Sequence, residues 1–252
     1  MKPHFIALLA LCLCVVGCAT FKDIGKHLWP SDQSNPQQAA DKGKPLPKDF
    51  KSLEALAEKG DARAQFQLAN KFYYGEGVAK DYVQSFEWAS RSAAQDNPKA
   101  KYRLASLYAQ GYGIAKDEDK AMALFKECAE GIRKLAEQND AQAQVFLGVM
   151  YYYGQGVEKD FKKAMKWSRD AAVQGHAEAQ YLIGAIHERG DLAGDAIDYV
   201  TAYAWYDLAS KNGNHPANIR MITLSVKMRL EQINKAEALA KEMIKKNPKL
   251  VK

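Results

Sequence analysis

The chain has 252 residues, of which 47% are hydrophobic and 26% are charged. This length allows a substantial apolar core, and the charged fraction excludes an integral membrane bundle. The formal net charge of +6 is modest and spread along the chain, so a nucleic-acid partner is not expected.

Residues 1–17 are predicted to be a signal peptide. Lys2 precedes an apolar run over residues 5–16, which is too short to span a bilayer as a mature helix. The run ends in Val15-Val16-Gly17-Cys18, which resembles the lipobox of bacterial lipoproteins. The resemblance implies that Cys18 is lipidated and anchors the protein in a membrane of the cell envelope, with the periplasmic face of the outer membrane favoured. An ordinary secretory signal with a chance cysteine is the alternative.

Residues 18–48 are predicted to be a flexible tether behind the lipid anchor. The segment is rich in Pro, Gln, Ser, Asn, Asp and Lys, a composition that favours a linker over a packed element. About thirty flexible residues have a root-mean-square reach of roughly 30 Å. The folded body could therefore search the periplasm near the membrane.

Residues 49–246 contain an internal repeat. An alanine that opens an apolar helical stripe recurs as Ala64, Ala100, Ala143 and Ala179, at steps of 36, 43 and 36 residues. In the first three units a Gly-x-Gly turn follows, then a Lys-Asp pair and, seven residues beyond the aspartate, a large apolar side chain. These landmarks are Gly75, Gly111 and Gly154; Asp81, Asp117 and Asp160; and Trp88, Leu124 and Trp167, with Asp198 and Trp205 in a fourth unit. Each unit predicts a helix hairpin that must stack on its neighbours to bury both apolar faces.

This pattern resembles the Sel1-like repeat family, a relative of the tetratricopeptide repeat. The resemblance implies an all-α fold, an α/α solenoid in which antiparallel helix hairpins stack into a right-handed superhelix. We expect four repeats plus capping helices, one over residues 51–59 and a divergent fifth hairpin after Pro216. The turn glycines can adopt the left-handed backbone that ends a helix, and the aspartates can cap the next one. The longer step predicts a second helix extended by seven residues around Cys128 to Gln138, with a local break possible at Gly131.

The motifs of common enzymes are missing from the sequence. The Gly-x-Gly turns lack the third glycine or the Gly-Lys-Ser/Thr of phosphate loops, and neither Ser-x-x-Lys nor Lys-Thr-Gly is present. His187-Glu188 has no second histidine at i+4, so a metal site is not expected. Cys128 is interpreted as a buried structural thiol, with a dimer-forming or redox-sensitive thiol as the alternative. We predict no catalytic residue, no cofactor and no metal, and we expect that the protein is not an enzyme.

The first helices of such hairpins line the concave side of a solenoid. Counting two before and five after Leu68, Leu104, Leu147 and Ile183 gives the residues expected to face inward. The predicted partner-binding residues are Phe66, Tyr73, Tyr102, Tyr152, Tyr181 and Glu188. Aromatic side chains offer large contact area with few rotors, which suits an extended peptide. For Phe66, Tyr102 and Tyr181 the alternative is the core of a repeat.

We therefore expect a scaffold or adaptor that binds protein partners of the cell envelope. One alternative is a protein that binds peptidoglycan or another glycan, because aromatic rings on a concave face could stack on sugars. The other is a β-lactamase-like or cell-wall hydrolase.

Overall fold

A computed structural model describes residues 45–192 and 196–251. The chain divides into two units, Met1–Lys48 and Asp49–Lys252. The predicted signal peptide, Cys18 and almost all of the predicted tether lie outside the described residues. The lipid anchor therefore stays a prediction.

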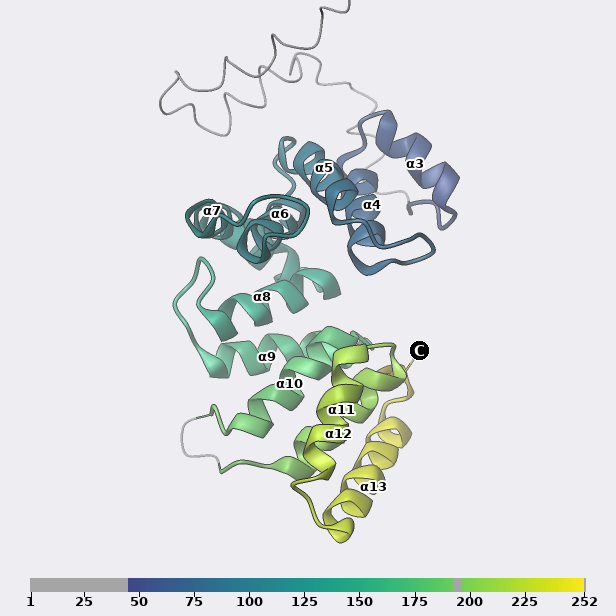
Figure 1. The fold of residues 1–252 in the computed structure, drawn as a ribbon, viewed down its shortest axis with the longest axis vertical. Coiled ribbons are helices and arrows are strands. Elements are labelled where there is room, and N and C mark those ends of the chain that lie inside the picture. The colour runs from purple at the N-terminus through teal and green to yellow at the C-terminus, as the bar shows by residue number, and fades with distance from the viewer. Residues whose placement is uncertain (1–44, 193–195, 252) are drawn as a thin grey trace, which may run out of the picture. The chain divides into compact units, whose positions relative to one another are not determined.

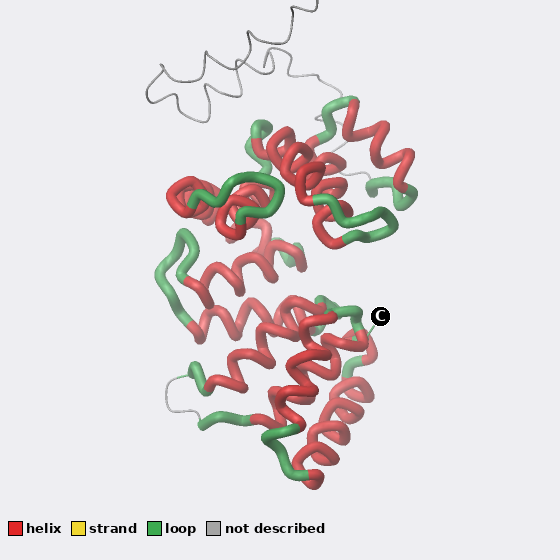
Figure 2. Tube along the Cα trace, viewed as in Figure 1, coloured by secondary structure: helices red, strands yellow, loops and turns green. Residues whose placement is uncertain are grey.

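The second unit is all-α, as predicted, and its described residues form no strand. Helix α3 (Phe50–Glu58) leads into four antiparallel hairpins that follow one another in chain order (Figure 1). The hairpins are α4 (Ala62–Tyr74) with α5 (Tyr82–Ala93), α6 (Pro98–Gln110) with α7 (Glu118–Glu137), α8 (Ala141–Tyr153) with α9 (Phe161–Ala172), and α10 (Ala177–Arg189) with α11 (Tyr199–Lys211). Figure 2 shows the turns that join the helices.

The turn residues act as the sequence predicts. Each first helix ends at a glycine with left-handed backbone, and φ at these glycines lies between 64° and 77°. Each second helix begins after an aspartate whose side chain accepts a hydrogen bond from a free backbone N–H. The glycines are Gly75, Gly111, Gly154 and Gly190, and the aspartates are Asp81, Asp117, Asp160 and Asp198.

The second glycine of the turn sets the distance between neighbouring hairpins. A Cβ atom on Gly113 would lie 2.2 Å from the carbonyl oxygen of Tyr82, and one on Gly156 would lie 2.4 Å from the carbonyl carbon of Phe125. Each of these turns therefore rests directly on the backbone of the preceding second helix. A Cβ on Gly77, in the first hairpin, would meet nothing within 4 Å.

The core consists of the repeated alanine and leucine positions. All eight are 0% exposed: Ala64, Ala100, Ala143 and Ala179, and Leu68, Leu104, Leu147 and Ile183. Among the large apolar residues of the second helices, Trp88 is 7% exposed and Leu124 is 5% exposed, whereas Trp167 and Trp205 are only half-buried.

The long second helix, α7, has 20 residues where α5 and α9 have 12, as the longer step predicts. It is continuous through Gly131, so the break considered at that glycine does not occur. A Cβ there would lie 2.7 Å from the side chain of Pro98. The glycine is thus a point of close approach between α6 and α7.

The C-terminal end departs from the predicted fifth hairpin. Helices α12 (His215–Ser225) and α13 (Leu230–Lys246) both pack on α11, and in the described part of the chain they do not pair as the four hairpins do. All three helices share one apolar cluster around Tyr206, Leu224 and Ala236. A 3-10 turn, η1 (Pro248–Leu250), follows. Over the described ranges, no helix combines the length and apolar character needed to cross a membrane.

Candidate functional site

The six predicted partner-binding residues lie on α4, α6, α8 and α10, the first helices of the four hairpins. We call the side of these helices that carries the six residues and their neighbours the first-helix face. Phe66, Tyr102, Tyr152 and Glu188 are 4%, 6%, 5% and 8% exposed. Tyr73 and Tyr181 are half-buried. The structure therefore leaves four of the six with almost no free surface, and a partner-binding role for the set stays a prediction.

A buried arginine packs among aromatic side chains in the N-terminal half of the first-helix face. Arg103 on α6 is 3% exposed. Its guanidinium carbon lies 3.9 Å from the ring centre of Tyr73 and 5.7 Å from that of Phe146, and its Nη2 donates a 2.8 Å hydrogen bond to the hydroxyl of Tyr74. A planar cation suits such stacking better than an ammonium. Arg103 thereby joins α4, α6 and α8.

Phe66 and Tyr102 pack in the same region. The ring of Tyr102 stacks on Phe146 with centroids 4.0 Å apart and 19° between the planes. Phe66 meets Phe146 edge-on at 6.4 Å. Both residues thus pack between the first helices, which agrees with the core interpretation considered for them.

Glu178, at the start of α10, acts electrostatically on this cluster. Burial alone would lower the pKa of Arg103, but Tyr74, Tyr73 and the Glu178 carboxylate hold it above its ordinary value. Burial raises the pKa of Tyr73 and Tyr74, and Glu178 adds to the effect at both. The arginine therefore stays cationic and the phenols stay neutral over the physiological pH range.

The C-terminal half of the first-helix face is more open. Tyr152 packs on Phe161 with centroids 5.4 Å apart, and its hydroxyl donates a 3.1 Å hydrogen bond to Asp191. The next residue, Tyr153, is 63% exposed. Burial raises the pKa of Tyr181, and Tyr153 is close enough to contribute to that rise. Sequence reasoning chose Tyr152 here, but the exposed ring belongs to Tyr153.

Glu188 joins three helices of the C-terminal end. Its Oε2 atom accepts hydrogen bonds from the Tyr206 hydroxyl on α11 at 2.8 Å and from the Arg220 Nη2 on α12 at 2.6 Å. Burial and the hydrogen bond to Glu188 raise the pKa of Tyr206. Gly184, one turn before Glu188, lets α10 approach, since a Cβ there would lie 2.7 Å from the Tyr206 ring. The Glu188 carboxylate is thus occupied within the fold.

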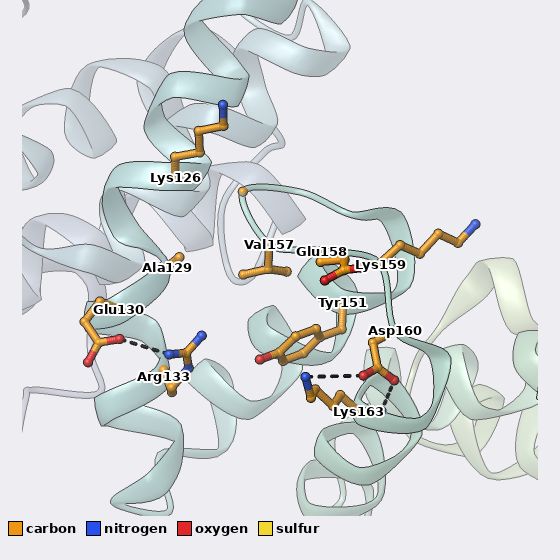
Figure 3. Close-up of a pocket in the computed structure, with 11 residues that line it drawn as sticks. Lys126, Ala129, Glu130, Arg133, Tyr151, Val157, Glu158, Lys159, Asp160 and Lys163 are labelled. Carbon is orange, nitrogen blue, oxygen red and sulfur yellow. Dashed lines mark hydrogen bonds and ion pairs between the residues drawn. The ribbon is translucent and has the colours of Figure 1, made fainter.

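A hollow of about 490 Å³ lies between α7 and the turn of the third hairpin (Figure 3). Its rim carries charges of both signs. Two ion pairs form there, Glu130 with Arg133 and Asp160 with Lys163. None of its eleven lining residues is Ser, Cys or His.

Cys128 is buried, as predicted, at 1% exposure, and its Sγ lies 3.4 Å from the carbonyl oxygen of Phe125. Burial raises the pKa of its thiol to about 12. No group of three or more His, Cys, Asp or Glu residues within 45–192 and 196–251 is placed to hold a metal ion.

Sequence reasoning missed an amide ladder on the loop edge, the side of the stack where one hairpin connects to the next. In three repeats a first-helix glutamine donates to the carbonyl of an alanine near the end of the preceding helix, which is α3 for the first repeat, and a second amide donates to that glutamine. The pairs are Gln65 with Gln95 at 2.8 Å, Gln144 with Gln174 at 2.8 Å, and Gln180 with Asn212 at 2.9 Å. The signal was the glutamine that follows Ala64, Ala143 and Ala179 directly. Lys101 replaces it in the second repeat and pairs with Asp96 and Glu127.

Comparison with known proteins accounts for the repeated hairpins. The Sel1 repeat family model matches residues 62–97, 98–131, 141–176 and 177–214, while a search of curated proteins found no match.

Among solved structures, a protective antigen of uropathogenic Escherichia coli with an SLR fold is 31% identical, with 79% of this chain and 49% of that chain covered and a TM-score of 0.46. A Sel1 repeat protein from Oxalobacter formigenes is 27% identical, with 65% and 63% covered and a TM-score of 0.42. Immunity protein Pa5087 from Pseudomonas aeruginosa is 21% identical, with 71% of each chain covered and a TM-score of 0.37.

This chain spans about half the length of the first of these structures and less than two thirds of the second. The four segments matched by the family model take up more than half of the chain and begin at α4, α6, α8 and α10. The chain belongs to the Sel1 repeat family.

Proposed function

We propose that the protein is a scaffold without enzymatic activity that binds protein partners at the bacterial cell envelope, tethered by a lipid on Cys18. The observation that carries the proposal is the open part of the first-helix face between α8 and α10. There Tyr153 is 63% exposed, beside the half-buried Tyr181. Stacked helical repeats present such surfaces on a rigid frame, which lowers the entropy lost on binding.

The chemistry of this surface favours a protein partner. Tyrosine and arginine are enriched among residues that dominate protein interfaces. Arg220, whose side chain is 39% exposed, is fixed by Glu188 near the same surface. A partner would therefore meet two aromatic rings and a positioned cation with little rearrangement of this chain.

Capture from envelope membranes tests the proposed surface. Chains carrying Tyr153→Ala and Tyr181→Ala together should recover about tenfold less of a stoichiometric protein from detergent extracts than the unaltered chain. Tyr112→Ala is the matched control, because Tyr112 is 37% exposed but lies in the turn of the second hairpin. Equal capture by all three chains would contradict a role for this surface, and sedimentation of the chain with purified peptidoglycan would favour a glycan instead.

The proposed anchor has a separate test. Cys18→Ser should move the protein from the membrane fraction to the soluble periplasmic fraction and remove incorporation of labelled palmitate, since several acyl chains are needed for stable anchoring. A Cys18→Ser chain that remains in the membrane fraction would contradict lipidation as the means of attachment.

A further inference from the structure

The chain's own C-terminal segment docks on the loop edge of the fourth repeat. The main-chain carbonyl of Leu250 accepts hydrogen bonds from Gln180 Nε2 at 2.7 Å and from Asn212 Nδ2 at 2.6 Å. The side chain of Asn247 donates to the carbonyl of Val173 at 3.2 Å. Leu250 itself is 4% exposed and shares an apolar cluster with Ala204 and Leu208 of α11 and Ala240 of α13. The amide pair of this repeat therefore holds a peptide main chain.

The third repeat carries the same arrangement around an open hollow. The hollow has a volume of about 510 Å³. Its lining includes Gln144, Gln174 and Glu137, the counterparts of Gln180, Asn212 and Val173 in the repeat register. Lys166 and Asp170 also line it, and they are the counterparts of Ala204 and Leu208. Gln180, Asn212, Val173, Ala204 and Leu208 thus each have an equivalent around this hollow, whereas Ala240 of α13, which shares the apolar cluster of Leu250, lies outside the repeats.

We propose that this hollow binds a short peptide segment of a protein partner, held as the chain's own Asn247–Val251 is held one repeat further on. The side chain of Asn139 marks the place of the ligand carbonyl. Its Oδ1 accepts from Gln144 Nε2 at 3.1 Å and from Gln174 Nε2 at 3.3 Å, the two amides that correspond to those bonded to Leu250. In the fourth repeat the position of Asn139 is taken by Gly175, which has no side chain, and the peptide carbonyl occupies that place.

The residues that differ between the two repeats define the ligand. Ala204 and Leu208 accept a leucine, whereas Lys166 and Asp170 form a charged wall beside Trp167. Glu137 adds a second carboxylate to the rim. Two carboxylates against one ammonium, with the Trp167 indole in the same lining, suit a basic side chain with an apolar stem in the place of Leu250.

This inference deepens the scaffold proposal and rests on it only because both concern protein partners. The surface lies on the loop edge rather than on the first-helix face. Its test uses the purified chain and a synthetic peptide without any envelope partner. Failure of one proposal is therefore distinguishable from failure of the other.

The probe is a fluorescent peptide with the sequence of residues 245–251 carrying Leu250→Arg, titrated with the full chain and followed by anisotropy. We expect saturable binding of one peptide per chain. Gln174→Ala should weaken it about tenfold, because it removes one donor to the ligand carbonyl. Asn139→Gly should strengthen it severalfold, since it vacates the carbonyl position and suits the backbone there, where φ is 64°. Gln84→Ala, a glutamine outside the hollow, should leave it unchanged.

The same assay can test the fourth repeat, on which the proposed peptide site of the third repeat is patterned. Leu250→Asp in the full chain should expel the docked segment, because it places a charge in a buried site. The unsubstituted peptide should then bind the fourth repeat, and Asn212→Ala should abolish that binding. The inference would be overturned if the unsubstituted peptide did not bind the Leu250→Asp chain, or if the Leu250→Arg peptide did not bind the unaltered chain, at chain concentrations up to about 1 mM. Saturable binding that is insensitive to both Gln174→Ala and Asn139→Gly would also overturn it.

Discussion

At the scale of single residues, one repeat position decides whether the first-helix face is closed or open. The third residue after the repeat alanine is Arg103 in the second unit and Leu182 in the fourth. Arg103 holds the hydroxyl of Tyr74. Leu182 stands in the same relation to Tyr153 but has no donor, and Tyr153 remains 63% exposed. The exposed aromatic surface thus arises where the repeat lacks its arginine.

The environment of Cys128 predicts an unreactive thiol. Only the thiolate is nucleophilic, and burial raises the pKa of this thiol to about 12. The test uses a chain in which the other three cysteines are replaced, Cys18 by serine and Cys12 and Cys14 by alanine, so that Cys128 is the one thiol left. At pH 8 the Cys128 thiol of the folded chain should react with a disulfide reagent at least about a hundredfold more slowly than in denaturant. Fast reaction of the folded chain would instead favour the redox-sensitive thiol considered from the sequence.

At the scale of elements, the turns connect one hairpin to the next through backbone contact. Gly77 and Gly156 have nearly equal φ values, 75° and 69°, so an alanine is strained at both. Only at Gly156 would the added Cβ also strike the preceding helix, 2.4 Å from Phe125. The two positions therefore separate backbone strain from the inter-repeat contact.

Gly156→Ala should destabilise the chain more than Gly77→Ala does. We expect about 1–2 kcal/mol of lost unfolding free energy at Gly77, from strain alone, and about 1–3 kcal/mol beyond that at Gly156, from the steric overlap. Urea denaturation followed by circular dichroism measures both. Equal losses would show that the turn can move away from α7 without cost.

The helix caps predict a specific dependence on pH. The backbone N–H of Lys163 holds the pKa of the Asp160 carboxyl below its ordinary value. A carboxyl with a lowered pKa contributes stability above its unfolded pKa and loses that contribution as the pH falls through its folded pKa. Asp160→Asn keeps an acceptor that does not titrate, and Asp160→Ala keeps none.

We therefore expect Asp160→Ala to cost about 1 kcal/mol at neutral pH, and Asp160→Asn to cost less. The difference in unfolding free energy between the unaltered chain and Asp160→Asn should shift in favour of the asparagine between pH 7 and about pH 3. Urea titrations of the three chains at both pH values measure this. Parallel curves for the unaltered chain and Asp160→Asn would contradict a charged cap.

At the scale of the whole molecule, the repeat explains how much the sequence could predict. The hairpins, their caps and their 0% exposed alanine and leucine positions recur at fixed offsets, and such periodic constraints can be identified in one sequence. Burial of Glu188 could not be predicted in this way. Its partner Arg220 comes from α12, outside the four repeats, and no offset connects the two. Periodicity places a side chain on a face, whereas a non-repeated neighbour decides whether that face is free.

The same reasoning explains the C-terminal error. The apolar spacing over 219–243 predicts two helices, and both are present as α12 and α13. It does not specify which helix they pack on. Tyr206 and Ala209 of α11 present a surface that both α12 and α13 cover. Pairing is a property of that surface and cannot be inferred from the two segments alone.

The Arg103 cluster predicts how loss of stability spreads through the stack. Arg103→Ala removes the donor to the buried Tyr74 hydroxyl and the cation stacked on the Tyr73 ring, and leaving a buried polar group without its partner costs about 1–3 kcal/mol. Arg103→Lys keeps the charge but not the planar fork, so its cost should lie between zero and that value. Arg133→Ala is the control, because its exposed pair with Glu130 should contribute less than about 1 kcal/mol.

Hydrogen exchange locates the effect. In a stack where each repeat contacts mainly its neighbours, a local defect lowers protection locally. Because Arg103 joins α4, α6 and α8, its loss should increase exchange in these three helices together, while α11 and α13 retain their protection. Increased exchange confined to α6 would show that the arginine does not couple the repeats. A uniform increase that includes α13 would show that the chain unfolds as one cooperative unit, and the repeats would then not be the units of stability.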